Sequence, residues 1–210
     1  IGIVTGIIGR STYDVAFYGE AGHSGTTGLT ERRDALFGAS DFITRAHHMI
    51  RALNNGSVFN CGSIHVEPGA FNVIPRLARA TVECRHPDED TLSQLESQLM
   101  ELAFSVAQEH RLRLEVKRRT HMPAASMSTE VVDAIRHALR TLEVENSMEL
   151  VSYAGHDAQM MSSFTPSGMI FIPSVNGISH NPKEFTEWDD VVNGANVLLH
   201  TVLHMAYTLG

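Results

Sequence analysis

Cysteine is scarce in this chain of 210 residues, which holds only Cys61 and Cys84 and no Cys-x-x-Cys pair. So few thiols argue against a disulfide scaffold and a cysteine-type zinc site, and they fit a reducing cytoplasm. Long apolar runs are also missing, since none approaches the ~18–20 residues that a membrane helix needs. Residues 1–6 show neither a basic segment nor a cleavage site, so the sequence predicts no signal peptide.

Positive charge is in the minority, because 16 Lys and Arg stand against 24 Asp and Glu and give a net charge of −8. A protein that binds the nucleic-acid backbone carries a basic face, which this balance argues against. The composition is 43% hydrophobic and 19% charged, which is typical of a folded protein. We therefore expect a cytoplasmic protein without nucleic-acid or membrane partners, and its 12 histidines are the first candidates for chemistry.

Residues 12–118 predict the element order β-α-β-β-α-β. Alternating apolar residues indicate strands at 12–19, 57–67, 77–85 and 112–116, and apolar steps of three and four indicate two helices between them. This order is typical of the split-βαβ, ferredoxin-like fold, in which two helices cover one face of a four-stranded antiparallel sheet.

After residue 120 the pattern changes to α/β alternation. Residues 148–152 predict a short strand, and the apolar run 169–173 predicts a buried central strand. In the final helix an apolar stripe is expected to face inward; its members are Val192, Ala195, Leu199, Val202 and Ala206. About 90 residues with two short strands make a thin sheet. The predicted fold class is therefore α+β followed by part of a larger α/β domain.

His180 follows the predicted strand at 169–173, within the sequence Gly-Ile-Ser-His-Asn-Pro-Lys-Glu at residues 177–184. Ligand sites of α/β sheets lie beyond the carboxyl ends of strands, which is where this histidine is expected. Its imidazole is either a metal ligand or a loop group that only forms hydrogen bonds.

Two further histidines lie beside glycines. His156 follows Gly155 and the strand at 148–152, and it either faces a ligand or belongs to the start of a helix. His23 lies in Gly-His-Ser-Gly-Thr-Thr at residues 22–27, which lacks the lysine of a phosphate-binding loop. This segment is interpreted either as a mobile loop that displays one histidine or as a plain connection.

Asn72 and Arg85 lie 13 residues apart, one before a predicted strand and the other at its end. Arginine offers a bidentate fork for a carboxylate, and asparagine offers both a donor and an acceptor. The alternative is a surface arginine in an ion pair. His200 and His204 are four residues apart on a predicted helix but lack the glutamate of His-Glu-x-x-His, so they are interpreted as one ordinary helix face.

Several short strings occur along nearly the whole chain in the order of a known family. They are Ile-Val-Thr-Gly-Ile-Ile-Gly at 3–9, Gly-His-Ser-Gly-Thr-Thr at 22–27, Arg-Arg-Asp-Ala at 32–35, Asn-Val-Ile-Pro at 72–75, Arg-His-Pro-Asp at 85–88, Ala-Gly-His-Asp-Ala at 154–158 and Pro-Ser-Val-Asn-Gly-Ile-Ser-His-Asn-Pro-Lys-Glu at 173–184. Together they resemble the bimetallic amidohydrolases and exopeptidases. The likeness is greatest to the branch that holds N-carbamoyl-L-amino-acid hydrolases and allantoate amidohydrolases.

The resemblance implies two domains. Residues 11–119 match a ferredoxin-like lid through which two chains form a homodimer. Residues 1–10 and 120–210 match part of an α/β catalytic domain that binds two divalent metal ions (Zn, Mn, Co or Ni).

The resemblance also implies roles for single residues. His180 matches the one metal ligand that the family takes from this region, and His23 matches the lid histidine that reaches the partner subunit's site and polarises the substrate carbonyl. The other matches are substrate-binding residues, namely Asn72, Arg85, Gly155 and His156. The arginine is expected to bind a carboxylate of the small-molecule substrate.

The chain also departs from the family pattern. The remaining metal ligands and the general base, which the family takes from a His-x-Asp string, a bridging Asp and a Glu-Glu pair, are not in this sequence. We therefore predict that the chain alone is inactive and is a portion of a longer enzyme. Tyr153 stands where glycine is usual, Gly28 replaces a proline, and Glu83 with Cys84 replaces an acidic-apolar pair, so the substrate stays open.

The predicted activity is hydrolysis of linear amides, such as N-carbamoyl-L-amino acids or allantoate-like ureido acids, by a metal-activated water. One alternative is an exopeptidase or aminoacylase of the same family. Another is a non-catalytic module that dimerises and binds amino acids.

Overall fold

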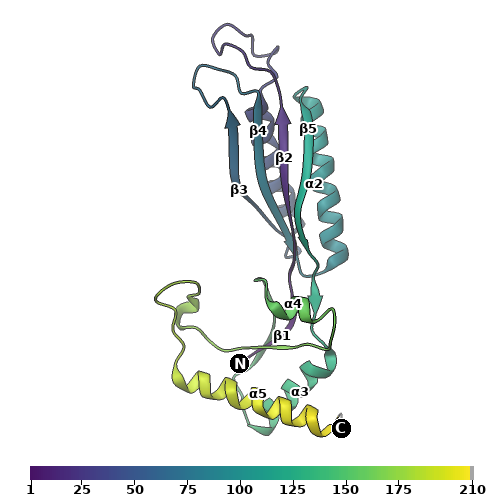
Figure 1. The fold of residues 1–210 in the computed structure, drawn as a ribbon, viewed down its shortest axis with the longest axis vertical. Coiled ribbons are helices and arrows are strands. Elements are labelled where there is room, and N and C mark those ends of the chain that lie inside the picture. Colours follow the sequence, from purple (N-terminus) through teal and green to yellow (C-terminus); the bar gives the residue numbers. More distant parts are fainter. Residues whose placement is uncertain (209–210) are drawn as a thin grey trace. The chain divides into compact units, whose positions relative to one another are not determined.

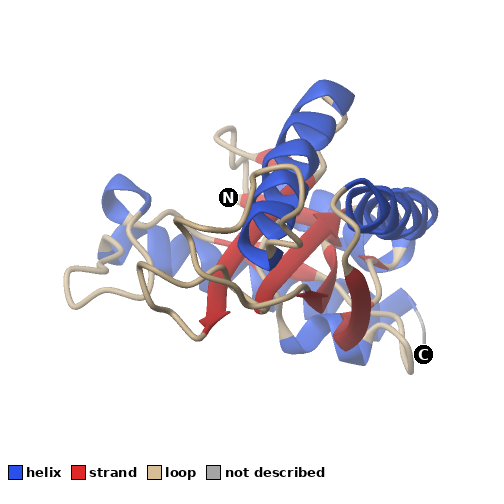
Figure 2. Ribbon diagram, turned by 90° about the horizontal axis from the view of Figure 1, so that it is seen from above, coloured by secondary structure: helices blue, strands red, loops and turns tan. Residues whose placement is uncertain are grey.

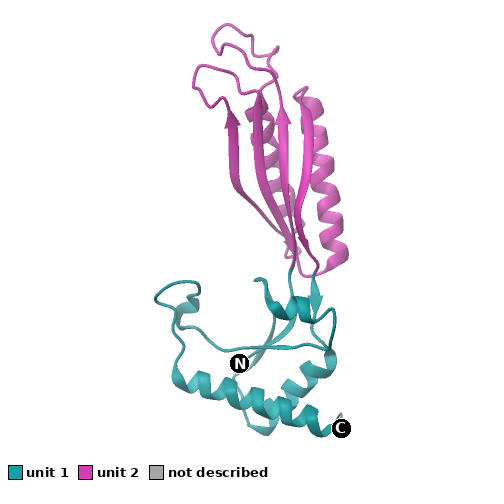
Figure 3. Ribbon diagram, viewed as in Figure 1, with its two compact units in different colours: residues 1–8, 124–210 teal, residues 9–123 magenta. Residues whose placement is uncertain are grey.

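The computed structural model describes residues 1–208 and divides the chain into two compact units, which Figure 3 colours differently. We call residues 9–123 the inserted unit, and residues 1–8 with 124–210 the flanking unit. The inserted unit begins two residues before and ends four residues after the predicted boundaries of 11 and 119. The reason is that pairing between its first and last strands continues to Arg10 and Met122.

The inserted unit has the predicted element order (Figure 1). Its elements are β2 (Gly9–Tyr18), α1 (Ala35–Leu53), β3 (Val58–Glu67), β4 (Leu77–His86), α2 (Glu89–Glu109) and β5 (Arg113–Met122). The strands form one sheet in the order β3-β4-β2-β5, and every neighbouring pair is antiparallel.

The core of the inserted unit consists of apolar side chains that alternate along the strands and recur with a helical period along α1 and α2. Every second residue of β4 from Ala78 to Cys84 is buried, and the same face is covered by buried residues of both helices. Phe42 of α1 is fully buried, with its ring centroid 5.9 Å from that of Phe17. Asp34 caps α1 by accepting hydrogen bonds from two backbone N–H groups of the first turn.

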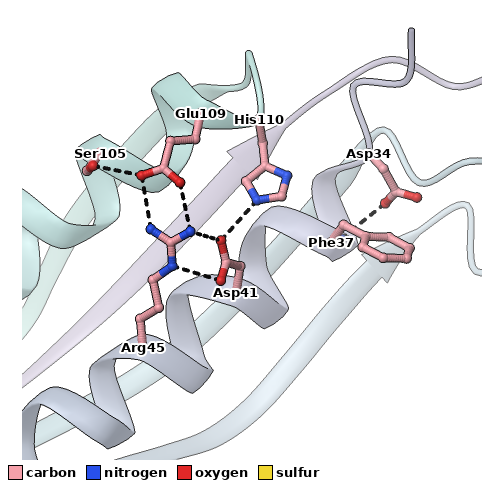
Figure 4. Close-up of polar contacts among 7 residues, drawn as sticks. All are labelled: Asp34, Phe37, Asp41, Arg45, Ser105, Glu109 and His110. Carbon is pink, nitrogen blue, oxygen red and sulfur yellow. Dashed lines mark hydrogen bonds and ion pairs between the residues drawn. The ribbon is translucent and has the colours of Figure 1, made fainter. Parts of the chain in front are cut away.

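A polar network joins the two helices at their outer surface (Figure 4). The Arg45 guanidinium contacts Asp41 at 2.8 Å and Glu109 at 2.7 Å, so one residue of α1 bridges to α2. His110 Nε2 lies 3.1 Å from Asp41, and Ser105 donates to Glu109 at 3.0 Å. The hydrogen bond from Arg45 lowers the pKa of Glu109.

The flanking unit is built around β1. Its elements are β1 (Gly2–Ile7), β6 (Ala125–Ser126), α3 (Thr129–Thr141), β7 (Met148–Ser152), α4 (Asp157–Met161), β8 (Met169–Phe171), the short 3-10 helix η1 (Val175–Gly177) and α5 (Trp188–Thr208). Strand β1 pairs in parallel with β7 and antiparallel with β6 and β8. The apolar run at 169–173 therefore forms a short, half-buried strand, because β8 pairs with β1 alone among the described strands.

The prediction for α5 is wrong about which face is buried. The structure buries Gly194, Val197 and Thr201, which lie on the opposite side of the helix from the predicted stripe. Gly194 explains this choice, because a Cβ there would lie 2.4 Å from Ile172 Cγ2, so only a glycine allows such close packing.

The members of the stripe that the sequence placed inward lie at the surface of this chain. Val192, Leu199 and Val202 are 53%, 54% and 55% exposed. Within residues 1–208, no helix combines the length and apolar character needed to cross a membrane.

Candidate functional site

Two long loops meet at one end of the inserted sheet, and they bring His23 and Asn72 together (loops in tan in Figure 2). The loop after β2 carries His23, and the loop after β3 carries Asn72. Ser24 N donates to Asn72 O at 3.1 Å, Ile74 N donates to Gly22 O at 2.8 Å, and His23 forms an isolated β-bridge with the residue after Asn72. The two predicted site residues are therefore backbone neighbours, and both are exposed.

The imidazole of His23 is held by its own loop. Gly25 N donates a hydrogen bond to His23 Nδ1 at 3.1 Å. The His23 carbonyl accepts from Thr26 N at 3.3 Å and from Thr27 N at 3.1 Å, so the chain turns back immediately after the histidine.

Arg32, which the sequence did not predict as a site residue, closes the same loop. Its Nε atom donates to Thr27 O at 3.1 Å, and its Nη2 atom donates to Ser24 O. Arg32 itself is half-buried. The only hint in the sequence is its place in the Arg-Arg-Asp-Ala string, which by itself does not tell the two arginines apart.

Arg85 lies at the opposite end of the sheet from His23 and Asn72. The two loops start beside the pair Tyr18–Leu77, whereas Arg85 pairs with Arg10 near the first residues of β2. Arg85 lies eight residue steps along β4 from Leu77, which at ~3.3 Å per step is roughly 26 Å. A small-molecule substrate cannot span that length.

Arg85 sits in a charged environment. Its Nε atom donates to Glu83 Oε1 at 2.6 Å, and both side chains are about three-quarters buried. Arg10 of β2 lies directly opposite Arg85 in the register, so two guanidinium groups share one end and one face of the sheet. The Glu83 carboxylate offsets one of these two charges, and we expect the remaining positive charge to favour an anionic ligand. Arg10 carried no signal in the sequence, because the pairing of β2 with β4 joins residues far apart in the chain.

His156 and Gly155 follow β7, as predicted. His156 precedes the five-residue helix α4 but makes no side-chain cap bond there. Its Nε2 atom lies 2.7 Å from Ser152 Oγ, and its ring centroid lies 5.5 Å from that of Phe171, the last residue of β8. The Gly155–His156 segment is therefore held close to the carboxyl end of β8, from which the chain continues toward His180.

His180 lies in an exposed loop between η1 and α5. Its φ is 54°, a left-handed conformation, and its backbone N–H donates to Glu184 Oε2 at 2.8 Å. No group of three or more His, Cys, Asp or Glu side chains suited to a metal ion occurs within the described residues. A catalytic zinc site commonly takes three protein ligands, which residues 1–208 do not bring together. In the helical pair His200 and His204, the ring of His204 stacks on that of His137 with centroids 4.0 Å apart.

The structure also shows a polar cluster near the start of α2 that the sequence did not predict. Ser11 Oγ is bonded to Glu96 and lies 2.7 Å from His121 Nδ1, while His121 Nε2 lies 3.2 Å from Glu89. Tyr13 donates to Glu96 at 2.8 Å, and burial raises the pKa of Tyr13. Ser11 is fully buried, and the cluster joins α2 to β2 and β5 of the sheet.

The chain is similar to known proteins along almost its whole length. A family model described as peptidase family M20/M25/M40 matches residues 13–204. The N-carbamoyl-L-amino-acid amidohydrolase of Pseudomonas sp. (strain NS671) is 31% identical over 204 residues, which cover 97% of this chain and 49% of that protein. The allantoate amidohydrolase of Escherichia coli (strain K12) is 31% identical over 207 residues, which cover 99% of this chain and 50% of that protein.

A solved structure shares the fold. An amidase of the hydantoinase/carbamoylase family from Burkholderia multivorans superposes with a TM-score of 0.84 at 32% identity, covering 96% of this chain and 49% of that one. The chain therefore spans about half the length of the relatives that it matches.

Proposed function

Because the chain belongs to peptidase family M20/M25/M40, we propose that it supplies the substrate-binding part of a hydrolase of linear amides. The substrates are N-carbamoyl-L-amino acids or allantoate-like ureido acids. One observation carries the proposal: the family match runs over residues 13–204 and thus across both units, and relatives over the same span are named as amidohydrolases of these two substrate classes.

The site residues have distinct roles in this proposal. His23 donates a hydrogen bond to the scissile carbonyl, and one such donor is commonly worth ~2.7–4 kcal/mol of transition-state stabilisation. Arg85 binds the substrate carboxylate, with Asn72 as a polar contact and the Gly155–His156 segment facing the substrate. His180 is one ligand of a centre of two divalent ions. We propose that its other ligands and the general base come from polypeptide outside these residues.

The site takes its residues from two chains. His23 and Asn72 lie together, whereas Arg85 lies roughly 26 Å away along one rigid sheet by the rise per strand residue. A substrate that contacts both ends must therefore lie between two copies. A homodimer, formed through the inserted unit, supplies His23 and Asn72 from one subunit and Arg85 from the other.

The exposed stripe on α5 supports the view that the flanking unit is part of a larger domain. A helix that is apolar on both faces is normally buried on both. The relatives are about twice as long as this chain, so they contain polypeptide that can cover the second face.

Substitution of His180 in the full-length protein tests the proposed activity. We expect His180→Ala to abolish most hydrolysis of N-carbamoyl-L-amino acids and allantoate, and chelation to have the same effect. The matched control His204→Ala lies in the same unit and should keep wild-type turnover. Unchanged hydrolysis by His180→Ala would favour the non-catalytic module, and faster cleavage of dipeptides would favour the exopeptidase.

A mixing experiment tests the two-chain site. Full-length His23→Ala and Arg85→Ala proteins are each expected to be nearly inactive. After dissociation and re-pairing, half of the dimers are mixed and each has one intact site, so activity should return to about a quarter of wild type. Activity that stays at the level of the single variants would show that both residues serve the same chain's site.

A further inference from the structure

We propose that Arg32 is a positioning residue that fixes the His23 loop so that the imidazole donates a hydrogen bond from Nε2. The role of His23 in hydrolysis rests on the proposed function. The geometry of the loop rests on its own contacts, so the two parts can be tested separately.

The hydrogen bond from Gly25 assigns the tautomer of His23. The backbone N–H of Gly25 points at Nδ1 over 3.1 Å, so Nδ1 is the acceptor and carries no proton. The proton of the neutral ring is then on Nε2, which leaves Nε2–H as the single ring donor for a ligand. A neutral imidazole in this state is suited to polarise a carbonyl without transferring its proton.

The Gly25 N–H can donate to Nδ1 only while the backbone of Gly25 stays within hydrogen-bonding distance of the ring. Arg32 keeps the backbone in that position. The guanidinium binds Ser24 O and Thr27 O, the carbonyls on either side of the two residues at the turn. The His23 carbonyl also accepts hydrogen bonds from the backbone N–H groups of Thr26 and Thr27. Arg32 thus binds the carbonyls at both ends of the turn. Without it, Gly25 is restrained by the bonds to the His23 carbonyl and by the bond from Ser24 N to Asn72 O.

The clamp depends on the shape of the guanidinium rather than on its charge. Both partners of Arg32 are neutral carbonyls, which are bound by two different nitrogens of one rigid plane. Lysine keeps the charge but has a single nitrogen on a flexible stem, so it cannot hold both carbonyls in this geometry. The loop is also tied to the end of α2, because Arg111 donates to the carbonyl of Thr30 and, at 3.3 Å, to that of Arg32.

The neighbouring arginine provides a matched control. Arg33 is exposed, and its side chain forms an ion pair with Glu20 at the surface. Arg33→Lys therefore changes the same residue type one position away, without touching the carbonyls of the turn.

Nitrogen-15 NMR of the histidine rings tests the geometry on this chain without any activity assay. In wild type we expect His23 to be protonated at Nε2, with Nδ1 unprotonated. In Arg32→Lys we expect a mixture of tautomers, and hydrogen exchange of the Gly25 amide should rise roughly tenfold, the effect of losing one hydrogen bond. Arg33→Lys should match wild type. A wild-type ring protonated at Nδ1, or an Arg32→Lys spectrum identical to wild type, would overturn the proposal.

A double-mutant cycle in the full-length protein tests whether Arg32 acts through His23. We expect His23→Ala to lower kcat roughly 10²–10³-fold and Arg32→Lys to lower it roughly 10-fold or more, with KM nearly unchanged, since the donor acts in the transition state. The double variant should be no slower than His23→Ala alone, because a residue that acts through the imidazole has no effect once the imidazole is removed. Losses that multiply in the double variant would refute the positioning role.

The two experiments separate the two claims. If the NMR result is as expected but His23→Ala is fully active, the proposed function fails while the loop geometry stands. If His23→Ala is inactive but Arg32→Lys is fully active, the proposed function stands and the positioning role fails.

Discussion

The two units bury their apolar surface to very different extents. In the inserted unit, an apolar stripe of each helix packs on one face of the sheet. The core that results includes fully buried Phe17, Phe42 and Leu99. In the flanking unit, α3 and one face of α5 cover the sheet, while large apolar residues of the other face of α5 are more than half exposed. The helices of the inserted unit thus bury their apolar stripes within this chain, whereas α5 leaves a second apolar stripe at the surface of the flanking unit, as interaction surfaces do.

The largest effect is expected from a substitution that creates a cavity in the core of the inserted unit. We expect Phe42→Ala to lower the free energy of unfolding by about 3–5 kcal/mol, since the ring is fully buried. Urea denaturation, followed through amide signals of β4, measures it. Phe37→Ala on the same helix is the control, because that ring is 66% exposed and its loss should cost less than about 0.5 kcal/mol. Equal costs would mean that the core does not carry the stability of the unit.

The next test concerns the close approach of Gly194 in α5 to Ile172. Gly194→Leu forces a side chain into the space held by Ile172, and we expect a loss of about 2–3 kcal/mol in the unfolding of the flanking unit. Thermal denaturation measures the change. Asn196→Leu places the same side chain at an exposed position two residues later and should cost little. If both variants are equally stable, the buried face of α5 is not the one described.

A smaller effect compares helix starts in the two units. Asp34 accepts hydrogen bonds from Leu36 N at 3.0 Å and Phe37 N at 3.2 Å, whereas Ser128 makes no side-chain bond at the start of α3. Asp34→Ala should therefore cost about 1 kcal/mol and Ser128→Ala only a few tenths, measured by chemical denaturation. The reverse order would contradict the cap assignment.

The smallest effect is expected on the exposed stripe of α5. Leu199→Gln should change the stability of this chain by less than about 0.5 kcal/mol, because the side chain packs on little. Val197→Ala, on the fully buried face, removes two methyl-sized groups and should cost about 1.6 kcal/mol at ~0.8 per group. If Leu199→Gln costs as much as Val197→Ala, the stripe is already packed in this chain and the comparison of the two units fails.

Much of the inserted unit could be predicted from local sequence. The sequence predicted a strand at 77–85 and a helix after it, and the structure forms β4 at Leu77–His86 and α2 at Glu89–Glu109. Each element has one apolar face, so local periodicity was enough to predict its type and place.

For helix α5, periodicity did not predict the buried face. It has apolar residues on two faces, and the sequence favoured the stripe with the larger side chains, from Val192 to Ala206. The structure instead packs the face with Gly194, because its small residues allow close approach to Ile172. Periodicity finds an apolar face, but it does not tell which partner covers that face.

The order of the elements, the family strings and the residue types at the candidate site depend on side chains near one another in the chain, so they could be predicted without a structure. The positions of His23 beside Asn72, of Arg85 at the far end of the sheet and of Arg32 on the histidine loop became known from the folded chain. Antiparallel pairing joins segments far apart in sequence, and the register of that pairing fixes which side chains meet.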